Sequence, residues 1–220
     1  MLKIILVIPS LIFEYLLIIK LNIRGLLKRN PPKNWSRGDK QDVILIHGFR
    51  ENWIFLEKIG NFLCNKGCKI HVPKRLKINT ASIVTNANIL EGFISENNLE
   101  NITLISHSKG GLIAKYFLGH SKASSKVDKV ISIATPYGGT YFSFLIGNIE
   151  LSPISKTIKY INKNRSSCKK IINIYPSFDN HVIPNRNLLL EGAKNIKIEV
   201  VGHTKILTHK NTIKLIEKHL

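Results

Sequence analysis

From Asp42 onward, short apolar segments alternate with longer segments, and this alternation constrains the fold more than any other feature of the sequence. The short segments have the length and composition of buried strands; they span residues 43–47, 68–73, 102–106, 127–134, 171–175 and 196–202. The longer segments are expected to be helices; they span residues 52–65, 80–99, 109–119 and 205–220. The alternation predicts an α/β fold, with a mostly parallel central sheet and helices on both faces.

A serine in the loop after segment 102–106 has the surroundings of a catalytic nucleophile. In parallel sheets ligands bind near the carboxyl ends of the strands, so the chemistry is sought in these loops. The sequence Ser106-His107-Ser108-Lys109-Gly110 has the small-x-Ser-x-Gly pattern of a nucleophile elbow, although Ser106 stands where glycine is usual. The pattern predicts Ser108 as a nucleophile. The alternative is an ordinary strand-to-helix turn in which Ser108 caps the helix.

The loop after segment 43–47 suits an oxyanion hole, the pair of amide donors that stabilises a tetrahedral intermediate. Gly48 allows the backbone to turn, so that the amide of Phe49 meets the amide of Lys109 near the reacting oxygen. We interpret His47 as structural, because the chain order of nucleophile, acid and base in this kind of fold places the catalytic histidine late.

Three segments resemble a known family: VILIHGFRENWIFLEKIGNFLCNKG at 43–67, ITLISHSKGGLIAKYFLG at 102–119 and VISIATPYGGT at 130–140. They are similar to the lipase and esterase branch of the α/β-hydrolase superfamily, with its small bacterial triacylglycerol-lipase-like proteins. The resemblance implies an α/β-hydrolase fold in which a Thr-Pro-x-x-Gly-Thr segment, here 135–140, lies beside the nucleophile. A short cap follows it, so residues 141–168 are a possible cap or lid. A plain surface helix pair is the alternative.

The predicted acid is Asp179, because it lies on the loop that follows segment 171–175. Its surroundings, SFDNHVIP, also resemble the acid loop of the family. Glu150 and Glu191 remain alternatives. Three other carboxylates lie at the wrong end of the sheet, within a strand or in the last helix: Asp128, Glu199 and Glu217.

The predicted base is His203, which comes directly after the last strand segment. His209 lies deeper in the closing helix, and His181 is only two residues from the acid; both remain alternatives. Ser108, Asp179 and His203 together predict a serine hydrolase that cleaves carboxylic esters through an acyl-enzyme, without a metal or a cofactor. An acyltransferase or a thioesterase would use the same triad, and a non-catalytic binding protein of this fold is a further alternative.

The N-terminal region has a different composition. Residues 4–19 are apolar apart from a few positions such as Pro9 and Glu14, and basic residues follow them. We expect an anchor that either spans the membrane or lies in its interface, with the catalytic domain on the cytoplasmic side by the positive-inside rule. Residues 30–40 read as a linker. The predicted organisation is an anchor and basic linker at 1–40 and a catalytic domain at 41–220.

The net charge of +19 favours anionic surfaces, either nucleic acid or acidic lipid. The basic residues are spread along the chain, and no nucleic-acid-binding motif occurs in it, so we expect no specific nucleic-acid partner. An apolar content of 44% excludes a disordered chain. The expected partners are a lipid or small acyl-ester substrate and a membrane contacted through the N-terminus.

Overall fold

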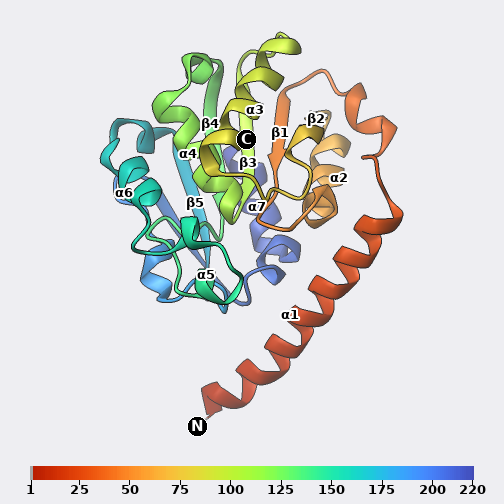
Figure 1. Ribbon diagram of the computed structural model, residues 1–220. Helices are drawn as coiled ribbons and strands as arrows, with labels where there is room; N and C mark the ends of the chain where they lie inside the picture. Colours follow the sequence, from red (N-terminus) through yellow and green to blue (C-terminus); the bar gives the residue numbers. More distant parts are fainter. Residues whose placement is uncertain (1) are drawn as a thin grey trace.

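The computed structural model describes residues 2–220, with side chains described from residue 8 onward. A six-stranded sheet has the order β2-β1-β3-β4-β5-β6, and all its neighbouring strands are parallel (Figure 1). The strands are β1 (Asp42–Ile46), β2 (Lys69–His71), β3 (Ile102–His107), β4 (Val127–Ile133), β5 (Ile171–Phe178) and β6 (Lys194–Val201). Each predicted strand segment overlaps one of these strands, and the predicted α/β fold class is confirmed.

Side chains along β1 alternate between two apolar layers, one on each face of the sheet. Ile44 and Ile46 pack in one layer and Val43 and Leu45 in the other, since successive strand residues point to opposite faces. The first layer is covered by α3 (Ile83–Glu96), α4 (Lys109–His120) and α6 (Lys156–Lys163). The second is covered by α1 (Leu2–Leu27), α2 (Glu57–Asn65) and α7 (Lys210–His219). Helices therefore cover both faces, as the continuous apolar strands predict.

Local capping sets helix boundaries that the periodicity did not define. The helix expected at 80–99 begins at Ile83, because the Ser82 hydroxyl accepts a hydrogen bond from an amide of the first turn. The helix expected at 205–220 is divided at His209, whose backbone is extended. Short 3-10 turns complete the chain: η1 (Lys33–Arg37), η2 (Trp53–Leu56), η3 (Lys74–Leu76), η4 (Lys122–Lys126), η5 (Ile149–Leu151), η6 (Ser166–Lys170), η7 (Asn185–Leu188) and η8 (Lys205–Thr208).

The segment that reads as a linker in the sequence is packed on the domain. Trp35 is buried, and its indole N–H donates to Asn61 Oδ1 at 2.8 Å. Its ring meets that of Trp53 edge-on, with 5.5 Å between the centroids. Gly60 permits this contact, because a Cβ there would lie 2.4 Å from the Trp35 ring. Residues 30–40 thus contribute a large side chain to the core beneath α2.

Helix α1 runs along one side of the domain, and its N-terminal end projects beyond it (Figure 1). It ends at Leu27, before the two prolines at positions 31 and 32. Among the helices that the structure describes, none combines the length and the apolar character needed to cross a bilayer.

The region after β4 forms the rim above the sheet. It contains α5 (Phe142–Leu145), the 3-10 turn η5 and α6, and α6 packs on α4. Several large apolar side chains of this rim face solvent: Tyr141, Phe144, Leu145, Ile149 and Ile154. Residues 141–168 are therefore short helical pieces rather than one continuous lid helix.

Candidate active site

Ser108 lies in a tight turn between β3 and α4. Its backbone has φ 51° and ψ −123°, a conformation that non-glycine residues adopt rarely. The Ser108 amide donates to the carbonyl of Ile133 at 2.9 Å, which holds the turn against β4. Ser106 is buried in β3, and its hydroxyl has no hydrogen-bond partner among the described residues. The site accommodates this serine in place of the usual glycine, and the turn joins a strand to a helix as a nucleophile elbow does.

Two glycines allow α4 to begin close to the sheet. A Cβ at Gly110 would lie 2.2 Å from the carbonyl oxygen of Ile46, and one at Gly111 would lie 2.0 Å from Thr135 Oγ1. The Ile46 oxygen is a backbone atom at the end of β1, a strand that pairs with β2 and β3, so it has little freedom to move away. The glycine of the elbow pattern is thus required by the packing of α4 on β1.

Gly110→Ala is therefore expected to lower the free energy of unfolding by about 1–3 kcal/mol or more, because the added methyl group overlaps a backbone atom. Urea denaturation followed by circular dichroism measures the change. Gly92→Ala is the matched control, because a Cβ at this position of α3 meets no atom within 4 Å. It is expected to raise stability by about 0.5–1 kcal/mol through helix propensity. Equal effects of the two substitutions would contradict the packing argument.

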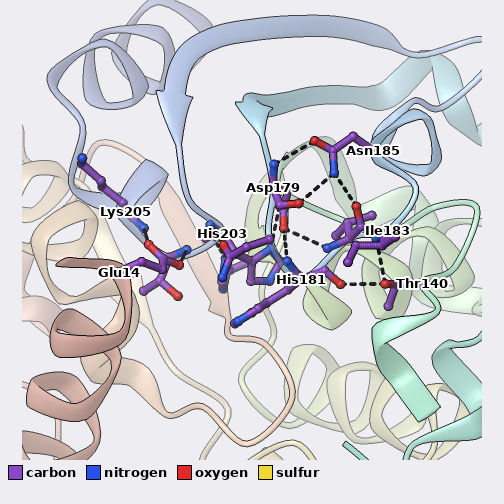
Figure 2. Close-up of polar contacts among 12 residues, drawn as sticks. Glu14, Thr140, Asp179, His181, Ile183, Asn185, His203 and Lys205 are labelled. Carbon is purple, nitrogen blue, oxygen red and sulfur yellow. Dashed lines mark hydrogen bonds and ion pairs between the residues drawn. The ribbon is translucent and has the colours of Figure 1, made fainter. Parts of the chain in front are cut away.

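Asp179 and His203 face each other from the loops that follow β5 and β6 (Figure 2). Asp179 Oδ2 lies 2.7 Å from His203 Nδ1. The other carboxylate oxygen accepts hydrogen bonds from the amides of His181 and Val182 at 2.8 and 2.9 Å. Asn185 accepts from the Asp179 amide and donates to its carbonyl. The carboxylate is thus fixed in the orientation that a histidine–aspartate pair requires.

Burial and pairing have opposite effects on the pKa of both groups. Burial favours the neutral carboxyl of Asp179, but the His203 ring and two backbone amides outweigh it and lower the pKa of Asp179. Burial also disfavours a charge on His203, but the Asp179 carboxylate, with smaller contributions from Glu51 and Glu14, raises the pKa of His203 above 6.5. Asp179 is therefore ionised at neutral pH, and His203 is a stronger base than an isolated histidine.

A cavity of about 260 Å³ is lined by both Ser108 and His203. Asp179 is fully buried and lies behind His203. The described side chains of Ser108 and His203 both face this cavity, and no hydrogen bond joins them. The cavity wall is largely apolar: Tyr15, Ile18, Phe55, Pro136, Phe142, Ile146, Leu151 and Val182 contribute to it.

Of the two residues predicted to form the oxyanion hole, one lines this cavity and the other follows Ser108 directly in the chain. Phe49 lines it, and Lys109 is the first residue of α4, where an amide has no partner within the helix. The buried Lys109 ammonium donates to the carbonyls of Asn79 and Ala81, so the side chain holds the loop before α3. Burial lowers the pKa of Lys109 to about 8. That the amides of Phe49 and Lys109 bind an oxyanion stays a prediction.

Three residues that the sequence left as alternatives for the acid or the base make contacts outside the Asp179–His203 pair. Glu150 accepts from the Ile83 amide at 3.0 Å and so caps α3. Glu191 forms an exposed ion pair with Arg165 at 2.9 Å. His209 caps α7 by accepting a hydrogen bond from an amide of its first turn. These contacts give each of the three residues a structural role, and none of these three described residues lines the cavity that contains Ser108.

His181 lines the cavity but forms an aromatic wall. Its ring stacks on Phe142 with 4.7 Å between the centroids, and it lies 4.8 Å from the His203 ring. Burial, together with the neighbouring His203 ring, lowers the pKa of His181 to about 3. The ring is therefore neutral, and His203 has the better geometry for a base.

Sequence reasoning missed a second carboxylate–imidazole pair, whose carboxylate also lines the cavity. Glu51 Oε2 accepts from the Gly48 amide at 2.7 Å and lies 2.9 Å from His107 Nδ1. Although burial opposes it, His107 lowers the pKa of Glu51, so this carboxylate stays charged. The other nitrogen of His107 lies 3.1 Å from the carbonyl oxygen of His203. No sequence pattern distinguishes Glu51 from a surface acid. His47 beside it is buried, with Nδ1 3.2 Å from the Gly48 carbonyl.

Within the described part of the chain, no group of three or more His, Cys, Asp or Glu side chains is arranged to hold a metal ion. The groups described above are a strained turn at Ser108, a buried carboxylate–histidine pair and a largely apolar cavity that Ser108 and His203 both line.

This fold is that of an α/β hydrolase. The sequence matches the lecithin:cholesterol acyltransferase family over residues 87–213, more than half of the 220-residue chain. The chain belongs to this family, and the resemblance to the lipase branch of the superfamily is confirmed. No curated protein matches the sequence.

Solved structures support the same fold. An α/β hydrolase from a sediment metagenome of the Mar Chica lagoon has a TM-score of 0.59 and 19% identity, over 83% of this chain and 91% of that one. The mature lipase BlEst2 of Bacillus licheniformis has a TM-score of 0.64 and 15% identity, over 86% and 94%. A structure described with carboxylesterases of the Thaumarchaeon Nitrososphaera gargenis has a TM-score of 0.64 and 14% identity, over 83% and 91%. At these identities the similarity establishes the fold.

Proposed function

We propose that the protein hydrolyses carboxylic esters through a triad of Ser108, His203 and Asp179 and a covalent acyl-enzyme. The observation that carries this proposal is the 2.7 Å contact between Asp179 and His203, in a pair that adjoins the cavity containing Ser108. Membership of a lipase-like acyltransferase family supports it. The strained turn at Ser108 supports it as well, because such backbone conformations cluster at active sites.

The mechanism follows from these groups. His203 accepts the proton of the Ser108 hydroxyl as its oxygen attacks the ester carbonyl. Asp179 holds the ring in the required tautomer and stabilises its positive charge. The amides of Phe49 and Lys109 stabilise the tetrahedral oxyanion, where one such donor contributes roughly 3–4 kcal/mol. His203 then protonates the leaving alcohol, and water activated by the same ring releases the acyl group as a carboxylate.

The substrate class that we propose is a lipid ester reached at a membrane surface. The cavity wall is largely apolar, and the rim around α5 exposes further apolar side chains. Helix α1, which lines the same cavity, exposes apolar residues on its outer side, and basic residues follow it. Such a surface fits the interface of an anionic bilayer. The cytoplasmic face is the expected side, by the positive-inside rule.

Turnover of p-nitrophenyl esters of increasing chain length tests the proposal. We expect hydrolysis by the wild type, with kcat/KM rising from acetate to medium-chain esters because longer chains fill the apolar cavity. Anionic vesicles containing a phospholipid substrate provide the second assay, with released fatty acid as the readout. Absence of turnover in both assays would contradict the proposal.

Acyl transfer is the second candidate, and membership of the lecithin:cholesterol acyltransferase family favours it. The same acyl-enzyme would pass its acyl group to an alcohol instead of water. Adding a lipid alcohol to the vesicle assay separates the two reactions, because transfer yields a new ester and hydrolysis yields only free acid.

A further inference from the structure

The N-terminal helix presents an unusual face to the domain. On a typical surface helix the apolar residues face the core. On α1 the described residues that contact the domain include Leu17 and Leu21 as well as several polar or small ones: Ser10, Glu14, Arg24 and Gly25. The large apolar residues on the outer side are more than half exposed: Ile12, Phe13, Leu16, Ile19 and Ile23. Burial of apolar surface alone therefore does not account for the polar contacts of this helix.

Glu14 is the central residue of this contact, and its side chain is fully buried. Its carboxylate accepts hydrogen bonds from the amides of Thr204 and Lys205, the latter at 2.8 Å (Figure 2). Gly202 leaves room for it, because a Cβ at this position would lie 2.5 Å from Glu14 Oε2. A buried carboxylate is costly unless it is hydrogen-bonded, and these two amides at the start of η8 meet that requirement.

These contacts lie on both sides of His203 in the chain. Glu14 contacts Gly202 before it and binds the amides of Thr204 and Lys205 after it. Ser10, one turn earlier in α1, donates to the Val201 carbonyl at 3.2 Å and accepts from the Lys205 ammonium at 3.0 Å. Helix α1 thus holds the backbone from residue 201 to residue 205.

The backbone of His203 itself is held by residues of the catalytic domain. Its amide donates to Asn180 Oδ1 at 3.1 Å, and its carbonyl oxygen lies 3.1 Å from His107 Nε2. The loop therefore lies between the body of the domain and α1. Without the Glu14 carboxylate, the amides of Thr204 and Lys205 would be buried or half-buried donors without a partner.

We propose that Glu14 is a positioning residue for His203. Helix α1 would then contribute to the active site in addition to making the membrane contact proposed above. This inference rests on the proposed function, because it assumes that His203 is the base. The same helix lines the cavity with Tyr15, Ile18 and Asn22. One side of α1 thus fixes the base, and the adjacent positions form a wall of the substrate cavity.

Glu14→Gln tests the proposal. The amide side chain has the shape of glutamate but no charge, and it places an N–H donor against one of the two amide donors. We expect kcat for a soluble short-chain ester to fall on the order of 10- to 100-fold with little change in KM, because the base is displaced while the cavity remains. A second readout is the low-field proton NMR resonance of the His203 Nδ1–H bonded to Asp179, which should broaden or shift in the variant.

Glu57→Gln is the matched control. Glu57 forms an ion pair of 2.5 Å with Arg24 and so ties α1 to α2 at a distance from His203. We expect this variant to retain the kcat and the low-field resonance of the wild type. If Glu14→Gln fails to fold, Ser10→Ala applies the same test more mildly, because it removes the hydroxyl between Val201 and Lys205.

The outcomes separate the two proposals. An inactive wild type would remove the proposed function itself. An active wild type with unchanged kcat and resonance in Glu14→Gln would overturn the positioning role, and so would an unchanged Ser10→Ala if that variant is used. An equal loss in Glu57→Gln would also overturn it, because any loosening of α1 would then suffice.

Discussion

Ser108→Ala is expected to lower kcat/KM for p-nitrophenyl esters on the order of 10⁴- to 10⁶-fold, because removing the nucleophile of a triad costs about as much as removing the whole triad. The substitution deletes one oxygen atom from a side chain that lines the cavity. The fold should be retained, because the hydrogen bond that holds the turn to Ile133 is made by the backbone. Steady-state kinetics measures kcat/KM, and circular dichroism on the same sample shows whether the fold is retained.

Ser106→Ala is the control for this result. Ser106 lies two residues away in β3, is fully buried, and has a hydroxyl without a partner among the described residues. Its removal should therefore leave kcat/KM within the range of the wild type. Activity that survives Ser108→Ala, or an equal loss in Ser106→Ala, would exclude Ser108 as the specific nucleophile.

Asp179→Asn is expected to lower kcat about 10⁴-fold, the loss that follows when the acid of a triad no longer fixes the histidine tautomer. The asparagine retains the size of the side chain but presents neither a charge nor two acceptor oxygens to His203 and the amides of His181 and Val182. Asp128→Asn is the matched control, because Asp128 is exposed near the start of β4.

The pH profiles of the wild type and of Asp179→Asn provide a second test. In the wild type, kcat/KM should rise with pH through a pKa above 6.5, because His203 accepts a proton only when neutral and Asp179 raises its pKa. In Asp179→Asn the residual activity should titrate at lower pH, because only the smaller contributions of Glu51 and Glu14 then oppose the effect of burial on the charged ring. An acid limb at the same pH in both enzymes would show that Asp179 does not act on the base.

The fold could be predicted because the sequence patterns that indicate its strands and helices are local. The apolar runs such as 102–106 are too short for helices and too continuous for half-exposed strands, so parallel strands were the consistent interpretation. The residues of the site followed from chain order, since each comes directly after a strand. The structure places Asp179 against His203 and brings Ser108 and His203 to one cavity; their catalytic roles stay predictions.

The residues that support the site were not predictable in the same way. Glu14 lies 189 positions before His203, and Glu51 lies in a loop without a motif; their partners are set by the tertiary fold. In the sequence Glu14 is a charge that interrupts an apolar run, whereas in the structure it binds the amides beyond His203. Trp35 likewise lies in a segment of linker composition and is buried against α2.

The most direct test of the central claim is peptide mapping after reaction with a fluorophosphonate, a probe that phosphonylates activated serine hydroxyls. Mass spectrometry of the digested protein should locate one adduct, on Ser108, and the adduct should be absent from Ser108→Ala and greatly slowed in Asp179→Asn. An unlabelled wild type, or an adduct on another serine that persists in Ser108→Ala, would contradict the account.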